Sequence, residues 1–404
     1  MEAQTVKLSD LGHNNIDNKS TLFKALKGND TIVVDGKFKE WIFSPIVLRN
    51  HSNKTILIDS NVVLKAKKNA FLKNSDCLFR IVNSKNIHLI GNHSRLIMNK
   101  KEYTLGEWRM GISIVGSSNI SIKNLTIEGS GGDGIYIDGN KTKTFSNNIL
   151  IENVVSRNNK RQGISIISAK DVIVRDSKFS HTKGTLPEAG LDIEPDSYKD
   201  IIQNIYFENC AFTNNNHSGI VLGLDNLNNE SEPVSIYFKD CFLSMNHVKE
   251  NRYPAAELVI SSNSESAVKG EVVFENLTVN GSEWRFLYSR KLSSGYHVYF
   301  NGLNVSDICQ SNLESSAIYL EVPDYYKSSG PIGGFTFKNS FFKFQSKSSV
   351  LTIKGSSLRT LVAAKNINGS ITVTNPNLSG YIEYIKYSKL KNIDFDLRFT
   401  RIEK

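Results

Sequence analysis

Two carboxylates lie two residues apart in a segment of alternating apolar residues. They are Asp192 and Glu194 in AGLDIEPD. If this segment is a strand, both side chains point to the same face, roughly 6.6 Å apart. Carboxyl pairs at about 5 to 9.5 Å carry out glycoside hydrolysis, in which one protonates the leaving oxygen and the other activates water or attacks the sugar. Because like charges this close repel each other, the spacing favours a catalytic pair over a solvated surface.

Further polar residues align with this pair when the chain is divided at glycines that precede alternating apolar residues. The glycines recur at steps of 23, 29, 27 and 29 residues, at Gly111, Gly134, Gly163, Gly190 and Gly219. Asp133 directly precedes one of them and is the third candidate catalytic carboxylate. The candidates for substrate binding are Trp108, Arg109, Tyr136, Asp138, Arg161, Gln162, His181, Lys183, Glu188 and His217.

The side-chain types of these candidates suit an acidic sugar. Arg109 and Arg161 are able to hold a carboxylate through paired hydrogen bonds. The rings of Trp108 and Tyr136 offer faces for sugar stacking. Each candidate also has an ordinary interpretation, since an outward charge on a repeat protein is often only solvated, and Asp133 fits a turn between glycines.

His181, Lys183 and Asp138 add titratable groups to the candidate site, and one acidic segment raises the question of a metal. His181 and Lys183, in the loop before Gly190, are placed to titrate or to bind anions. Asp138 falls in the column of Glu194, two repeats and roughly 10 Å away. The acidic DGIYIDGN suits Ca²⁺ by ligand type, but its spacing is not that of an EF-hand loop, so no metal and no cofactor are expected.

A second repeat identifies the elements that must position these residues. It consists of alternating apolar residues, then Asn or Asp, then another apolar pair, with a period of roughly 23 to 37 residues. Alternation with a period of two indicates strands, and one coil per period predicts a right-handed parallel β-helix, an all-β solenoid. A leucine-rich repeat would be shorter and stricter, and a propeller would need four strands per unit.

The polar residue of this repeat has a conformational reason. Asn and Gly tolerate the left-handed backbone that a corner between two strands requires, and stacked Asn amides form a ladder along the axis. The corner positions are Asn124, Asn153, Asp176, Asn209, Asp240, Asn276, Gly302 and Asn339. Two cysteines follow such positions on successive coils, Cys210 and Cys241, and are expected as buried thiols; a disulfide between them is conceivable, and a zinc site is not expected because no CxxC spacing occurs.

The ends of the chain predict a division into three segments of one continuous domain: 1–75 as N-terminal cap and first strands, 76–345 as coils, and 346–404 as last coils and C-terminal cap. Ser20 to Gly28 predicts a short capped helix. Residues 381–404 are expected to fold back as the other cap. Strands are expected at 31–34, 45–48, 55–58, 62–64, 257–260, 317–322 and 350–354.

Composition excludes several classes. The chain has 404 residues, 39% of them hydrophobic, 8 prolines and 4 cysteines, which is typical neither of a disordered chain nor of a disulfide scaffold. No run approaches the roughly 18 apolar residues of a membrane span, and no signal peptide is visible. The net charge of +9 favours an anionic partner, but no basic-aromatic motif suggests nucleic acid.

Two stretches resemble a known family. VKLSDLGHNNIDNKSTLFKALKG resembles the N-terminal cap of pectin-lyase-like β-helix proteins. Residues 106–196, with GEWRMGISI, GGDGIYIDG, NNKRQGISIIS and GTLPEAGLDIEPD, resemble right-handed β-helix proteins of bacteria and phages, including tailspike-type depolymerases and other polysaccharide-active enzymes. The acidic residues that match the group's pattern are Asp133, Asp192 and Glu194, with Arg109, Arg161 and Gln162 beside them. The Asn-Thr-Asp, Asp-Asp, Gly-His-Gly and Arg-Ile-Lys motifs of polygalacturonases are absent as a set.

The resemblance and the carboxylates together predict a glycoside hydrolase that cleaves an acidic or decorated bacterial exopolysaccharide or capsule. Asp192 or Glu194 would be the general acid, with the other or Asp133 as base or nucleophile, and Arg161 would hold the substrate. The alternatives are a polysaccharide lyase, with His181, Lys183 or Tyr136 as base, and a non-catalytic glycan-binding solenoid. The resemblance also implies an extracellular or virion-associated location, no membrane partner and a homotrimer.

Overall fold

The computed structural model describes residues 4–104, 107–247, 256–263, 265–310, 315–322, 330–355, 362–385 and 391–402. The chain divides into two compact units, residues 1–188 and 189–404. The three segments of the sequence analysis and their union in one continuous domain stay a prediction.

The first unit is built almost entirely of short strands. Its elements are β1 (Thr5–Lys7), the 3-10 helix η1 (Leu8–Leu11), α1 (Lys19–Gly28), β2 (Thr31–Val34), β3 (Glu40–Phe43), β4 (Ile46–Arg49), β5 (Ser52–Ile58), β6 (Val63–Ala66), β7 (Phe79–Val82), β8 (Lys85–Ile97), the 3-10 helix η2 (Lys100–Glu102), β9 (Ile112–Val115), β10 (Ser118–Glu128), β11 (Ile135–Asp138), β12 (Ser146–Glu152), β13 (Val155–Arg157), β14 (Gln162–Ile166), β15 (Ala169–Arg175) and β16 (Lys178–Ser180).

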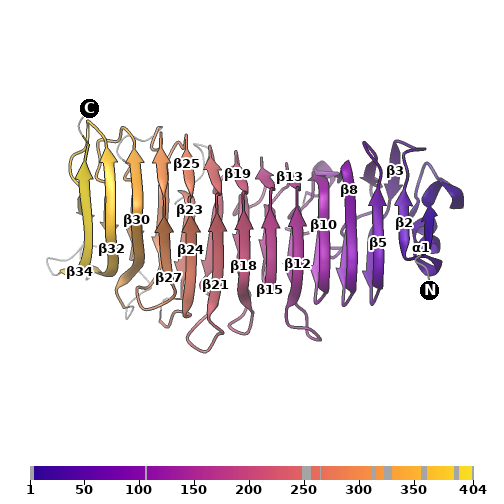
Figure 1. The fold of residues 1–404 in the computed structure, drawn as a ribbon, viewed down its shortest axis with the longest axis horizontal. Helices are drawn as coiled ribbons and strands as arrows, with labels where there is room; N and C mark the ends of the chain where they lie inside the picture. Colours follow the sequence, from indigo (N-terminus) through magenta and orange to yellow (C-terminus); the bar gives the residue numbers. More distant parts are fainter. Residues whose placement is uncertain are drawn as a thin grey trace. The chain divides into compact units, whose positions relative to one another are not determined.

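These strands form three parallel series in which each strand pairs with its counterpart one coil later. One series is β1, β2, β5, β8, β10, β12 and β15, several of which lie side by side in Figure 1. The second is β3, β6, β8, β10, β13 and β16, where the long strands β8 and β10 span both series. The third is β4, β7, β9, β11 and β14.

The second unit repeats this plan. Its strands are β17 (Ala189–Ile193), β18 (Ile202–Glu208), β19 (Ala211–Thr213), β20 (Ile220–Leu224), β21 (Val234–Lys239), β22 (Phe242–Ser244), β23 (Ala256–Ser262), β24 (Gly270–Glu275), β25 (Thr278–Asn280), β26 (Arg285–Arg290), β27 (His297–Asn301), β28 (Asn304–Ser306), β29 (Ile318–Glu321), β30 (Ile332–Lys343), β31 (Leu351–Lys354), β32 (Val362–Thr374), β33 (Ile382–Ile385) and β34 (Lys391–Arg401).

The pairing in the second unit is also parallel throughout the three series. They are β18, β21, β24, β27, β30, β32 and β34; β19, β22, β25, β28 and β30; and β17, β20, β23, β26, β29, β31 and β33. The predicted parallel β-helix is therefore confirmed in each unit.

Inward side chains stack from coil to coil and form the core. In the second unit, Phe207, Phe238, Phe274, Phe300 and Phe337 are buried and their neighbouring ring centroids lie 4.6 to 5.1 Å apart. This spacing follows from the strand separation of about 4.8 Å. Because the core is one coil wide, the chain lengthens by adding coils and does not need a thicker core.

The corner prediction is confirmed. All seven Asn or Asp corner residues have φ between 49° and 56°, and Gly302 has φ 76°. Asn153 Nδ2 donates to Asn124 Oδ1, and Asn276 Nδ2 donates to Asp240 Oδ1, both at 2.9 Å. A second ladder, which was not predicted, lies on another corner and is formed by Asn53, Asn86, Asn119 and Asn148.

The first and last predicted elements need correction. Helix α1 ends at Gly28 as expected but begins at Lys19, and the carboxylate of Asp17, instead of a Ser20 hydroxyl, accepts a hydrogen bond from its first amide at 3.0 Å. The last strands, β33 and β34, do not fold back: they pair in parallel with β31 and β32 and continue the coils. Whether either end caps the core stays a prediction.

The four cysteines are buried and free, as expected of reduced thiols. Cys210 and Cys241 form no disulfide, and their Sγ atoms lie near main-chain carbonyl oxygens of Glu208 and Phe207. The thiols are therefore part of the core.

Candidate functional site

The third strand series of the first unit carries the predicted outward column. Tyr136 of β11 pairs with Ser113 of β9 and with Ser165 of β14, and Asp138 pairs with Val115. The alignment on glycines therefore predicted the register of these strands correctly.

Asp133 lies at the start of β11 and is fully buried, with 0% of its side chain exposed. Ser165 Oγ donates to Asp133 Oδ2 at 2.9 Å, and Arg161 Nη1 lies 3.8 Å from the same oxygen. The main-chain amide of Asp133 lies 3.4 Å from the sulfur of Met110. The predicted catalytic carboxylate Asp133 is therefore enclosed by the protein, with no exposed surface of its own.

Arg161 lies between two carboxylates. Its Nε is 3.4 Å from Glu107 Oε2, and 14% of its side chain remains exposed. A guanidinium that is already paired with Glu107 and Asp133 has fewer donors for a substrate carboxylate. Glu107 was missed, although it directly precedes Trp108 in the motif GEWRMG, where an acidic residue was a recognisable signal.

Trp108 and Arg109 have different environments. Trp108 is 43% exposed, which suits its predicted role in sugar stacking. The guanidinium of Arg109 donates to the main-chain oxygens of Phe71 and Leu72 at 2.9 and 3.1 Å and lies over the ring of Tyr103. These contacts favour a structural role for Arg109 over the predicted substrate contact.

Tyr136 and Asp138 interact with each other. The hydroxyl of Tyr136 donates to Asp138 Oδ2 at 2.9 Å, and the amide of Gly139 donates to Asp138 Oδ1 at 2.6 Å. The phenol ring is half-buried on the outer face of β11. The pair thus holds an aromatic ring and a carboxylate in fixed orientation on this face.

The loop 181–188 carries a histidine, a lysine and one buried acid. His181 and Lys183 are exposed, whereas Glu188 is buried and its Oε1 accepts a hydrogen bond from the amide of Gly184 at 2.6 Å. Burial lowers the pKa of Lys100 to about 8, against the attraction of Glu188 and with further lowering by Lys160 and Lys183. Lys100 was missed because it lies outside the repeats.

The carboxylate pair that opens the sequence analysis lies in the second unit. Asp192 belongs to β17, pairs with Val221 of β20, and is 1% exposed. Glu194 follows two residues later and is half-buried. A Cβ at Gly223 would lie 3.7 Å from Glu194 Cγ, which places Glu194 beside the next coil as the alignment predicts.

Two predicted binding residues are buried. Gln162 is 0% exposed at the start of β14. His217 is buried, its Nδ1 lies 2.9 Å from Ser218 Oγ, and its ring is 6.0 Å from that of His247, which contacts Trp284. These positions favour packing roles for both residues.

Metals and membranes are addressed by two observations. Within the described ranges, no group of three or more His, Cys, Asp or Glu side chains is arranged to hold a metal ion. In the same part of the chain, no helix is long and apolar enough to cross a bilayer.

One relative matches a limited part of this sequence. The chain is 28% identical over 160 residues to the uncharacterized protein YclG of Bacillus subtilis. The match covers 35% of this chain and only 26% of YclG, so it spans about a quarter of that protein.

Solved structures share the fold at low identity. The A-module of the mannuronan C-5 epimerase AlgE6 of Azotobacter vinelandii has a TM-score of 0.62 at 13% identity, with 98% of this chain and 99% of that chain covered. A family 28 exopolygalacturonase of Yersinia enterocolitica has a TM-score of 0.57 at 10% identity, with 97% and 78% covered. The tailspike of Escherichia coli bacteriophage HK620, in complex with a pentasaccharide, has a TM-score of 0.54 at 12% identity, with 94% and 78% covered.

The family is shown by the sequence itself. The model of the right-handed β-helix region matches residues 94–318, which is more than half of the chain and includes the candidate residues between Trp108 and His217. The parallel pairing of every strand series agrees with this match. The chain belongs to the right-handed β-helix family.

Proposed function

We propose that this protein is a polysaccharide-degrading enzyme, a glycoside hydrolase that acts on an acidic or decorated polysaccharide. The observation that carries the proposal is the pair Asp192, within β17, and Glu194, directly after its end, because two residues along a strand correspond to roughly 6.6 Å. The names of the structural neighbours, an exopolygalacturonase, a mannuronan epimerase and a tailspike bound to a pentasaccharide, support a glycan substrate.

The two carboxyl groups are suited to different roles. Asp192 is 1% exposed, and we assign it the role of the acid that donates a proton to the leaving oxygen. Glu194 is half-buried and in contact with solvent, so it is placed to activate water or to attack the anomeric carbon. As the glycosidic bond breaks, the leaving oxygen takes the proton of Asp192 and the anomeric carbon takes the oxygen of water, which leaves its proton on Glu194.

The first unit carries polar and aromatic groups of its own that suit a glycan. They are the exposed ring of Trp108, the fixed ring of Tyr136 and the exposed ammonium group of Lys183. Asp133 is a candidate for orienting Arg161, because its Oδ2 lies 3.8 Å from Arg161 Nη1. The predicted extracellular or virion-associated location and the homotrimer stay predictions.

The first experiment is a screen of acidic polysaccharides with the intact chain and two variants. We expect Asp192→Asn and Glu194→Gln each to lower turnover by at least about a hundredfold, because each removes a proton-transfer group, with thermal unfolding nearly unchanged. Glu208→Gln, on the exposed end of β18, is the matched control and should keep full activity. The readout is the release of reducing ends, and normal turnover in both site variants contradicts the proposal.

The runner-up is a polysaccharide lyase, favoured by one observation. Lys100 Nζ donates to Asn158 Oδ1 at 3.3 Å and to the main-chain oxygen of Asn159 at 2.9 Å, close to the loop of Lys183. Burial lowers the pKa of Lys100 to about 8, which brings this amine closer to acting as a base near neutrality. A lyase removes the C5 proton of a uronate and leaves a double bond that absorbs ultraviolet light. Absorbing products without added water in their mass would select the lyase over the hydrolase.

A further inference from the structure

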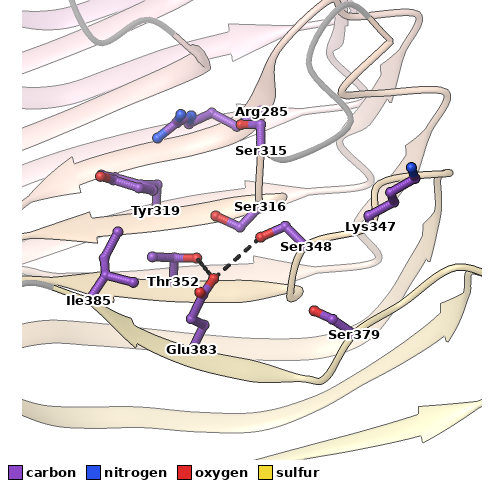
Figure 2. A pocket seen from close by; sticks show the side chains of 10 residues that line it. All are labelled: Arg285, Ser315, Ser316, Tyr319, Lys347, Ser348, Thr352, Ser379, Glu383 and Ile385. Carbon is purple, nitrogen blue, oxygen red and sulfur yellow. Dashed lines mark hydrogen bonds between the residues drawn. The ribbon is translucent and has the colours of Figure 1, made fainter.

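A polar cavity of about 430 Å³ opens in the second unit, at the beginnings of strands β26, β29, β31 and β33. Figure 2 shows Arg285 on one side above the ring of Tyr319, and Glu383 on the opposite side. The volume lies in the range of pockets that hold small ligands. None of the sequence repeats pointed to it.

Arg285 is the unusual group of this cavity. It is 8% exposed, and its guanidinium carbon lies 4.1 Å from the centre of the Tyr319 ring and 5.5 Å from that of Trp284. Among the described residues it has no hydrogen-bond acceptor and no carboxylate within 4 Å, and its Nε is buried without a partner. Burial lowers its pKa, while nearby tyrosines, Cys309 and Glu321 oppose that effect.

The carboxylates near this guanidinium are already engaged. Glu321 accepts hydrogen bonds from the Tyr288 hydroxyl at 2.5 Å and from Lys354 at 2.6 Å. Glu383 Oε2 accepts hydrogen bonds from Ser348 and Thr352 at 3.4 and 3.5 Å, as the dashed lines in Figure 2 show. A buried cation to which no described carboxylate is paired is costly, so the geometry favours an anionic ligand at the Arg285 end of the cavity.

The rest of the lining suits a sugar. Ser316, Ser348 and Thr352 present hydroxyl groups, and Tyr319 presents a half-buried ring. Hydroxyls and aromatic faces bind the polar edges and apolar faces of a pyranose, and a planar guanidinium matches a carboxylate by two parallel hydrogen bonds. The chemistry of the cavity therefore matches a sugar that carries a carboxylate.

The cavity is in line with the proposed catalytic pair. Within the second unit, Asp192 pairs with Val221, Val221 with Val259, Val259 with Tyr288, and Tyr288 with Tyr319. Four strand steps of about 4.8 Å separate Asp192 from Tyr319, or roughly 19 Å. A polysaccharide running along this column would reach the cavity several sugars away from the bond that is cleaved.

We propose that this cavity is a distal subsite that binds a uronate residue of the polysaccharide through Arg285. This inference rests on the proposed function, because it assigns the substrate class, but the binding event can be measured without turnover. The polar side chains of Lys347 and Ser379 line the cavity and are exposed to solvent.

The test is calorimetric titration of the full chain with sodium glucuronate, with glucose as the neutral probe and inorganic sulfate and phosphate as the other anions. We expect glucuronate to bind the unaltered protein and Arg285→Met to weaken it at least about tenfold, because the paired hydrogen bonds are lost. Met keeps an unbranched apolar stem against the two rings. Lys239→Met, which removes an exposed cation at the end of β21, is the matched control and should bind as before.

A second variant keeps the test informative if Arg285→Met does not fold. Glu383 is exposed, so Glu383→Gln should fold, and by removing a repelling charge it should strengthen glucuronate binding about two- to fivefold without affecting glucose. Equal binding by Arg285→Met and the unaltered protein would overturn the proposal. So would unchanged binding by Glu383→Gln, equal binding of glucose, or binding of sulfate and phosphate alone.

Failure of this inference is distinguishable from failure of the proposed function. Asp192→Asn should lose turnover and keep glucuronate binding. If no acidic polysaccharide is cleaved by the unaltered protein, the hydrolase proposal fails, while the effect of Arg285→Met on glucuronate binding still decides the subsite.

Discussion

Buried acids in this protein are satisfied in two different ways. Asp133 has a cation and a hydroxyl beside it, Arg161 and Ser165. Glu257, at the start of β23, is fully buried and its oxygens accept hydrogen bonds from the amide and the side chain of Asn246 at 3.0 and 2.6 Å. Amide donors stabilise the charged form less than a cation does, so burial prevails and raises the pKa of Glu257 to about 7.

This raised pKa predicts a pH dependence of stability. Because the pKa is higher in the folded protein than its ordinary value of 4.5, the contribution of Glu257 is fully present below about pH 4.5 and is lost as the pH rises to about 7. The loss is about 3 kcal/mol of unfolding free energy at most. We expect Glu257→Gln, which does not titrate, to flatten this part of the pH profile.

Urea unfolding of the unaltered protein and of Glu257→Gln at pH 5 and pH 8 measures the effect. Glu271→Gln, on the outer side of β24, is the control for removing a carboxylate. If Glu257→Gln keeps the pH slope of the unaltered protein, Glu257 is not the group responsible.

At the scale of one element, each strand series depends on the corner that ends its strands. Asn276 has φ 54° and bonds to Asp240 one coil earlier, while Gly302 takes the same corner position one coil later with φ 76°. Gly302 has no Cβ, and one placed there would lie 2.7 Å from Asn276 Oδ1. The left-handed backbone is thus the main requirement at this corner, and the amide hydrogen bond is an additional one.

This order predicts different costs for two substitutions at Asn276. Asn276→Ala should lower the unfolding free energy by about 1–2 kcal/mol, because Ala carries a Cβ into the left-handed region and loses the hydrogen bond. Asn276→Gly should cost less, because only the hydrogen bond and some chain entropy are lost. Chemical denaturation of both variants measures the difference, and equal costs would show that the amide, and not the backbone, matters at this corner.

At the scale of the whole molecule, the net charge of +9 is spread over a chain that contains two compact units. Exposed cations of the first unit include Lys183 of the 181–188 loop, whereas those of the second include Lys347 at the rim of the Arg285 cavity. An acidic polysaccharide that binds to either unit would therefore meet exposed cations there. Such contacts are long-range and are screened by salt.

We expect the affinity for an acidic polysaccharide to fall as ionic strength rises, because screening weakens the attraction of exposed cations. The affinity for a neutral polysaccharide of similar length should change little. Titrations at about 0.05 and 0.5 M salt compare the two, and a salt-independent affinity for the acidic polymer would argue against an electrostatic contribution from the net charge.

Much of the fold could be predicted from the sequence, because a β-helix repeats a local rule. Alternation of apolar residues, a glycine before one strand and Asn or Asp after another together specify a coil, and they recur often enough to be recognised. The register of Tyr136 with Ser113 and Ser165 followed directly from this alignment. The C-terminal strands were harder to predict, because β33 and β34 lack the clear corner residues. They pair in parallel with the preceding coil and continue the stack.

The candidate site was predicted only in part, because burial and pairing depend on residues from other coils and loops. The column positions of Asp192 and Glu194 follow from spacing. The burial of Asp133, the hydrogen bonds of Arg109 to Phe71 and Leu72, and the burial of His217 do not. Arg285 begins β26 but belongs to none of the motifs recognised in the sequence. Local sequence patterns determine the path of the backbone. The partners of each charged side chain, in contrast, come from distant segments that only the folded chain brings together.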